Sequence, residues 1–114
     1  MKKSSKGIVG ILLCISLGVI FSVAVAFAAD AKAGEAAYTK ACKSCHGADG
    51  TPNANIAKMM KVEMKDLKAP EVQSMSTDEI KKIITSGLGK MKGISSVKGS
   101  AVDDVAAYVK SMKK

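Results

Sequence analysis

The segment Cys42-Lys43-Ser44-Cys45-His46 constrains this chain more than any other part of its sequence. Two cysteines three residues apart, on one helical turn, can each add to a vinyl group of a haem, and the histidine that follows can then direct its imidazole at the iron. This is the pattern of c-type haem attachment. It predicts one covalently attached haem c bound by Cys42, Cys45 and His46, with His46 as an iron ligand.

Two other chemistries use the same residue types. A structural zinc site needs further ligands, but His46 is the only histidine and Cys14 is the only other cysteine. A redox-active dithiol of the thioredoxin kind needs a strand–helix–strand context and a larger fold than this chain offers. Each alternative therefore lacks something that it requires elsewhere in the sequence.

A haem would also make up for a shortage of large apolar side chains. Residues 30–114 contain 35 apolar residues, but 12 of them are Ala and two are Cys. Tyr38 and Tyr108 are the only aromatic residues in that stretch. A domain of this length with so few bulky side chains is close to the limit at which a core supports itself. We therefore expect a cofactor to fill part of its centre.

The N-terminal segment predicts export. Three lysines precede an almost wholly apolar run from Ile8 to Phe27, and Ala26-Phe27-Ala28 supplies small residues for a cut after Ala28. Residues 1–28 are therefore interpreted as a cleaved signal peptide and 29–114 as one haem-binding domain, which we expect in the periplasm. The alternative is a retained membrane anchor, because 7–29 is an uncharged stretch of 23 residues.

Charge favours an acidic protein partner. The chain carries 18 basic and 10 acidic residues, and every basic residue is Lys. Without residues 1–28, 15 Lys remain against 10 acids, a net charge of about +5. Nucleic acid is not expected as a partner, because Arg side chains for reading bases are absent and the domain is exported. Membrane contact is expected only if the N-terminal segment is retained.

The remaining sequence predicts an all-helical domain. Asp30 can cap a helix over 31–41, and Ser76 with Glu79 forms a capping box before a helix that ends at Gly87. Gly99-Ser100 opens a last helix. One face of that helix is apolar through Val102, Val105, Ala106, Val109 and Met112. A shorter helical segment is indicated by the spacing of Ile56, Met59, Met60 and Met64. Segments 47–55, 65–75 and 86–99 are expected to be loops, and no strand is predicted.

A methionine is the best candidate for the sixth iron ligand. A thioether favours the reduced metal, so His/Met ligation suits electron transfer. Met91 lies in a predicted loop between Gly87 and Gly93, where glycines let the backbone pass close to a cofactor. Met75 and an open or water-bound position remain as alternatives. The helical spacing of Met59, Met60 and Met64, and the inward face that carries Met112, indicate core positions.

In combination, these residues resemble a class I cytochrome c of the small bacterial monohaem type. Gly34 and Tyr38 on the first helix match the family's contact with the last helix, where Val105 and Tyr108 fit the matching pair. The resemblance implies three to four short helices around one haem, with the N- and C-terminal helices crossing. The chain departs from the family in having no Trp or Arg to donate hydrogen bonds to the haem propionates. In the family, a proline after the histidine often offers its carbonyl to the imidazole, and Pro52 is the only candidate for this role in the loop after His46.

The predicted function is single-electron transfer between redox proteins, with no enzymatic activity. With both axial positions filled, no substrate can reach the iron. A positive rim formed by Lys43, Lys90, Lys92 and Lys98 is expected to steer acidic partners to a monomeric carrier. The alternative is a haem sensor or peroxidase-like protein with an open sixth position.

Overall fold

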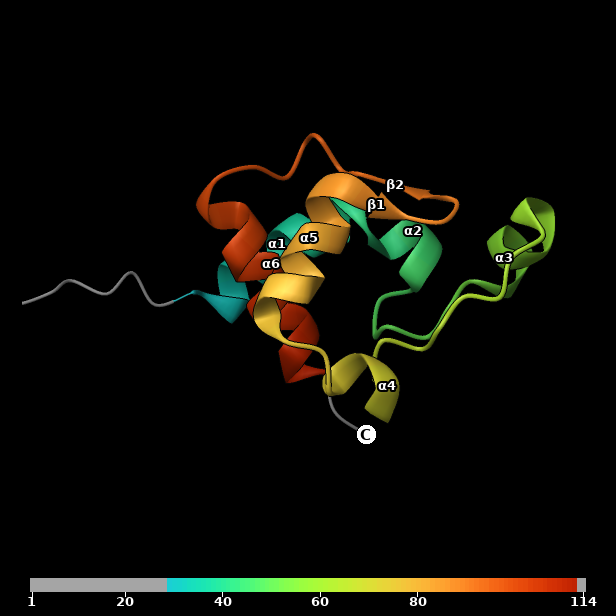
Figure 1. The fold of residues 1–114 in the computed structure, drawn as a ribbon, viewed down its shortest axis with the longest axis horizontal. Helices are drawn as coiled ribbons and strands as arrows, with labels where there is room; N and C mark the ends of the chain where they lie inside the picture. Colours follow the sequence, from blue (N-terminus) through green and yellow to red (C-terminus); the bar gives the residue numbers. More distant parts are fainter. Residues whose placement is uncertain (1–28, 113–114) are drawn as a thin grey trace, which may run out of the picture.

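A computed structural model describes residues 29–112. The predicted signal peptide or anchor at 1–28 lies outside the described residues, as does the predicted end of the domain at 113–114. The elements in chain order are α1 (Ala31–Ala41), α2 (Lys43–His46), α3 (Ala54–Met60), α4 (Pro70–Gln73), α5 (Thr77–Ser86), β1 (Gly87–Leu88), β2 (Met91–Lys92) and α6 (Ser100–Ser111). The predicted all-helical class is confirmed (Figure 1).

Local sequence explains where the longer helices begin. The Asp30 carboxylate accepts hydrogen bonds from the amides of Lys32 and Ala33 and so caps α1. At α5, Ser76 and Glu79 form the predicted capping box, with both reciprocal hydrogen bonds present. These caps satisfy amides that have no partner within the helix.

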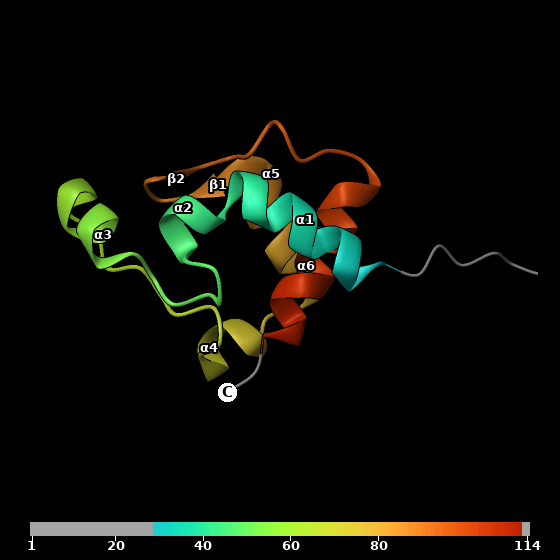
Figure 2. The ribbon, with the colours of Figure 1, turned by 180° about the vertical axis from the view of Figure 1, so that it is seen from behind.

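The first and last helices form the centre of the fold. A Cβ built on Gly34 would lie 1.9 Å from the Asp104 carbonyl oxygen, so only Gly permits this approach of α1 to α6. Tyr38 and Tyr108 meet edge to face with ring centroids 5.2 Å apart. Val105 on α6 is buried beside them. The predicted crossing of the N- and C-terminal helices is therefore confirmed, and α5 packs against α6 (Figures 1 and 2).

Four of the helices in the described residues have seven or more residues, α1, α3, α5 and α6, as the expected three to four short helices require, and α2 and α4 are single turns of four residues each. Two expectations about the loops are wrong. The segment 65–75, expected to be a loop, contains α4 with Pro70 at its first position. The segment 86–99 contains a two-residue antiparallel ladder, in which Gly87 pairs with Lys92 and Leu88 with Met91.

The helix α3 ends earlier than its apolar spacing indicates, and it stands apart from the other helices. It stops at Met60 because Lys61 adopts a left-handed conformation, with φ of 53°, so Met64 lies beyond it. No residue of α3 is buried, and Met59, expected in the core, has 71% of its surface exposed. Figures 1 and 2 both place α3 away from α1, α5 and α6.

Within residues 29–112, no helix is both long enough and apolar enough to cross a membrane.

Candidate haem-binding site

The predicted attachment residues occupy one turn directly after α1. Cys42 ends α1 and begins α2, and its carbonyl accepts hydrogen bonds from the amides of Cys45 at 3.2 Å and His46 at 3.0 Å. Gly47, with φ of 74°, ends this helix after a single turn. Both cysteines are free thiols, and Cys42 is buried. The local fold thus holds two thiols and an imidazole on one short helical turn.

All four predicted site residues line the same cavity. It has a volume of about 500 Å³ and includes Cys42, Cys45, His46 and Met91 in its wall. An adjoining cavity of about 270 Å³ shares these four residues. The rest of the larger cavity is mainly apolar, with α5 and α6 contributing Ile80, Ile83, Ile84, Val105 and Val109. Cavities of this size and character are typical of cofactor sites.

Burial shifts the pKa of two attachment residues, Cys42 and His46. It lowers the pKa of His46, which keeps the imidazole neutral and leaves a ring nitrogen lone pair able to bind a metal. Burial, and then the neighbouring Cys45, raises the pKa of Cys42 to about 11. Free thiols beside a neutral imidazole and a thioether therefore fit a covalently attached haem, in both chemistry and available space.

One ring nitrogen of His46 lacks a hydrogen bond among residues 29–112. Its Nδ1 atom is buried and finds no partner within the described part of the chain. The Pro52 carbonyl, the candidate acceptor in the loop after His46, makes no hydrogen bond to this nitrogen.

Met91 reaches the cavity from the β1–β2 hairpin. The flanking glycines serve the hairpin itself: a Cβ on Gly87 would lie 2.4 Å from the Met91 carbonyl oxygen, and one on Gly93 would lie 2.3 Å from the Thr85 carbonyl oxygen. Gly89, with φ of 57°, occupies the first position of the connecting turn, where a hairpin turn of type II′ requires Gly. The glycines thus allow the hairpin to fold back tightly onto the end of α5.

Other methionines also reach this region. Met60, Met64 and Met75 line the larger cavity, and Met60 lines the smaller one as well. Met112 is buried in the core, as its position on the inward face of α6 predicts. Several thioethers therefore lie within one cavity wall, and the sequence spacing of Met60 and Met64 did not reveal this.

The lysines of the predicted rim are not equivalent. Lys90 and Lys92 line the smaller cavity, and Lys43 lies between the two cysteines on α2. Lys98 precedes α6 and lines neither cavity. The Lys90 ammonium donates a hydrogen bond of 2.8 Å to the Met60 carbonyl and so ties the hairpin to the end of α3.

Sequence reasoning did not single out Lys68. Its ammonium binds Thr51 and Asp49, which are 17 and 19 residues away in the chain. Hydrogen bonds from Thr51, first from its amide, and then from Lys68 lower the pKa of Asp49 to about 2. Lys68 is one of many lysines, so no pattern in the sequence distinguishes it.

The zinc alternative finds no support in this region. No group of three or more His, Cys, Asp and Glu side chains within residues 29–112 is arranged to hold a metal ion.

Comparison with known proteins agrees with this geometry. Residues 29–109 match the model of a family described as cytochrome c oxidase, cbb3-type, subunit III. A solved structure of the KustC0563 c-type cytochrome is similar with a TM-score of 0.60 and 25% sequence identity, over 71% of this chain and 98% of that one. No curated protein gives a significant match. The family match spans all the cavity residues discussed above.

Proposed function

The chain belongs to the c-type cytochromes as a small class I member, a family of haem-binding electron carriers, and we propose that this protein carries single electrons between periplasmic redox proteins with its iron held by His46 and Met91. The observation that carries the proposal is the larger, mainly apolar cavity, whose wall includes Cys42, Cys45, His46 and Met91. When bound, haem supplies an iron that exchanges one electron reversibly.

The side chains of this protein would set the conditions for that exchange. Cys42 and Cys45 would hold the cofactor covalently. The neutral imidazole of His46 and the thioether of Met91 would be the two side chains that bind the iron, and a thioether ligand favours the reduced metal. The apolar side chains that α5 and α6 contribute to the cavity wall would lower the local dielectric around the iron, which also affects the potential. If both side chains bound the iron, they would leave no position on it for a substrate, which would favour a carrier over an enzyme.

An absorption spectrum of the purified protein under potential control tests the proposal. We expect the bands of a c-type haem and a weak ferric band at the red edge of the visible range, which reports sulfur ligation. Met91→Ala should abolish that weak band. Met64→Ala, which changes a methionine in the same cavity wall, is the matched control and should retain it.

Other spectra would point to a different ligand or a different function. A band lost only in Met60→Ala or Met75→Ala would assign the sixth ligand to a different methionine. A wild-type spectrum without the band would favour the open-site sensor or peroxidase. Purified protein without haem would contradict the proposed function altogether.

We further propose that lysines near the two cavities guide acidic redox proteins to this surface by electrostatic attraction. Lys90 and Lys92 line the smaller cavity and Lys43 lies between the two cysteines, so these three lysines would attract acidic redox proteins to the haem-binding region. The second-order rate of electron exchange with an acidic partner should fall as ionic strength rises. Lys92→Ala should lower the rate at low salt more than Lys98→Ala does, because Lys98 lines neither cavity. A rate independent of salt would contradict the docking proposal.

Periplasmic location rests on the N-terminal sequence alone. The mass of the purified protein tests it, because cleavage after Ala28 removes residues 1–28 and leaves Ala29 as the first residue. A full-length mass with recovery in the membrane fraction would support the retained anchor.

A further inference from the structure

The imidazole ring of His46 lacks the hydrogen bond that usually fixes the orientation of a metal-binding histidine. Histidines that bind metals usually donate their second ring N–H to a carbonyl or carboxylate, which fixes the orientation of the imidazole. The Nδ1 atom of His46 is buried and finds no such acceptor among residues 29–112. The orientation of the ring must therefore depend on how firmly the backbone on either side of His46 is held.

The first contact on this backbone comes from α1. The buried hydroxyl of Tyr38 donates a hydrogen bond of 2.7 Å to the carbonyl of Gly47, the residue that follows His46. The loop is also closed at its far end, because the amide of Asn53 donates to the Cys45 carbonyl at 2.9 Å. The loop that follows His46 is thus held by hydrogen bonds at Gly47, where it begins, and at Asn53, where it ends.

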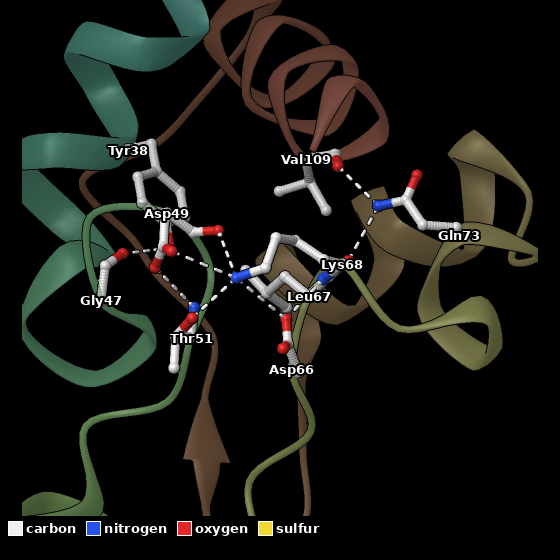
Figure 3. Close-up of polar contacts among 9 residues, drawn as sticks. All are labelled: Tyr38, Gly47, Asp49, Thr51, Asp66, Leu67, Lys68, Gln73 and Val109. Carbon is white, nitrogen blue, oxygen red and sulfur yellow. Dashed lines mark hydrogen bonds and ion pairs between the residues drawn. The ribbon is translucent and has the colours of Figure 1, made fainter. Parts of the chain in front are cut away.

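The middle of the 47–51 loop is held by Lys68 (Figure 3). The Lys68 Nζ atom lies 2.6 Å from the Thr51 hydroxyl, 3.2 Å from the Asp49 carbonyl and 3.3 Å from the Asp49 carboxylate. It also forms an ion pair of 3.4 Å with Asp66. An ammonium group has three donors, and these contacts use all of them.

Lys68 is itself anchored to the helical centre of the molecule. The amide of Leu67 donates to the Gly50 carbonyl at 3.0 Å, directly beside the Lys68 contacts. The side-chain amide of Gln73 bridges the Leu67 carbonyl at 2.8 Å and the Val109 carbonyl of α6 at 2.9 Å (Figure 3). The contacts therefore run without interruption from α6 through the 66–68 segment to the loop after His46.

We infer that Lys68 is a positioning residue, which fixes the imidazole of His46 by clamping the 47–51 loop to the segment anchored on α6. The inference rests on the proposed role of His46 as iron ligand. Lys68 is not part of the docking rim, since only 17% of its side chain is exposed and its charge is already paired with Asp49 and Asp66. Its effect on the iron is indirect, because it lines neither cavity.

The test compares haem-loaded wild-type protein with Lys68→Met. The proton shifts of the haem methyl groups in the ferric protein report the angle of the axial imidazole plane. Lys68→Met should change the spread of these shifts, and Lys68→Arg should restore much of it because a guanidinium can donate to the same oxygens. The amide of Leu67 should exchange about tenfold faster in Lys68→Met, since a charge-assisted network around it is lost.

Lys81→Met is the matched control. It removes the same charge from an ion pair of 2.6 Å with Asp103, between α5 and α6, without touching the 47–51 loop. It should lower stability but leave the haem methyl shifts unchanged. If Lys68→Met does not fold, Thr51→Val removes only one acceptor of the Lys68 ammonium and should produce a smaller change in the same direction.

The outcomes separate the inference from the proposed function. Wild-type protein without haem methyl signals would contradict the function itself. Clear wild-type signals that neither Lys68→Met nor Thr51→Val alters would overturn the inference alone. A Lys81→Met spectrum altered as much as that of Lys68→Met would also overturn it, because the effect would then be general loosening.

Discussion

Replacing Gly34 by Ala tests the helix crossing on which the fold depends. The added Cβ would lie 1.9 Å from the carbonyl oxygen of Asp104, and ordinary contact begins at 3.4 Å, so the helices must separate by about 1.5 Å. The oxygen belongs to the α6 backbone and cannot rotate away. Such a shift also disturbs the contact between Tyr38 and Tyr108 and the 2.8 Å hydrogen bond from the Asp30 amide to Asp104.

The expected loss of stability follows from opposing contributions. Overpacking of this kind costs about 1–3 kcal/mol, and the upper end applies because a backbone atom is struck. A weakened aromatic pair adds about 0.5–1.5 kcal/mol. The better helix propensity of Ala offsets about 1 kcal/mol. The net effect is about 2–3 kcal/mol, which lowers the melting temperature of a domain of this size by roughly 10–20 °C.

Thermal unfolding of the haem-loaded protein, followed by far-ultraviolet circular dichroism, measures this loss. Ala36→Gly, at an exposed position of the same helix, is the control for helix propensity and should cost about 1 kcal/mol. A Gly34→Ala variant that melts at or above the wild-type temperature would refute the reasoning, since the close approach of α1 to α6 would then not require Gly.

Three further outcomes are expected. Exported chains in which Cys42 and Cys45 are both replaced by Ser should be degraded, and recovery of a folded apoprotein on a gel-filtration column would contradict this. The melting temperature of the wild type should fall from about pH 4 to pH 2, because Asp49 has a pKa of about 2 when folded against an ordinary value of 3.8, so its stabilisation is present above the higher value and is lost as the pH falls through the lower. Asp49→Asn should remove part of that fall in a pH series of melts. Lys90→Met should speed amide exchange in α3 by removing its bond to the Met60 carbonyl, with little effect on exchange in α6.

Local and periodic signals in the sequence were sufficient to predict the longer helices α1, α5 and α6. The apolar face of α6 follows a helical repeat, and Val102, Val105, Ala106, Val109 and Met112 are all buried as predicted. The capping box of α5 lies within four residues, so it could be identified without any tertiary information. The same holds for the attachment turn, because its three functional residues are contiguous or nearly so.

Features that depend on distant contacts could not be predicted in this way. The end of α3 is set by the left-handed Lys61, a residue type that gives no stop signal. Met59 has helical spacing, but no residue of α3 is buried, so the spacing did not predict the exposure of Met59. Lys68 acquires its role only when two loops far apart in sequence meet. Periodicity predicts which face of a helix is apolar, but not whether a partner covers it.

The position of the core links cofactor and fold. Ile80, Ile84, Val105 and Val109 belong to the buried cluster that joins α5 to α6, and the same four side chains form part of the cavity wall. A cofactor seated in that cavity would pack against the residues that hold the two helices together. Loss of the cofactor would therefore leave one side of the helix interface without packing partners, in a domain whose remaining buried side chains are few and mostly small. Binding of the haem and folding of the chain should accordingly be coupled, with the thiols of the attachment turn making that coupling permanent.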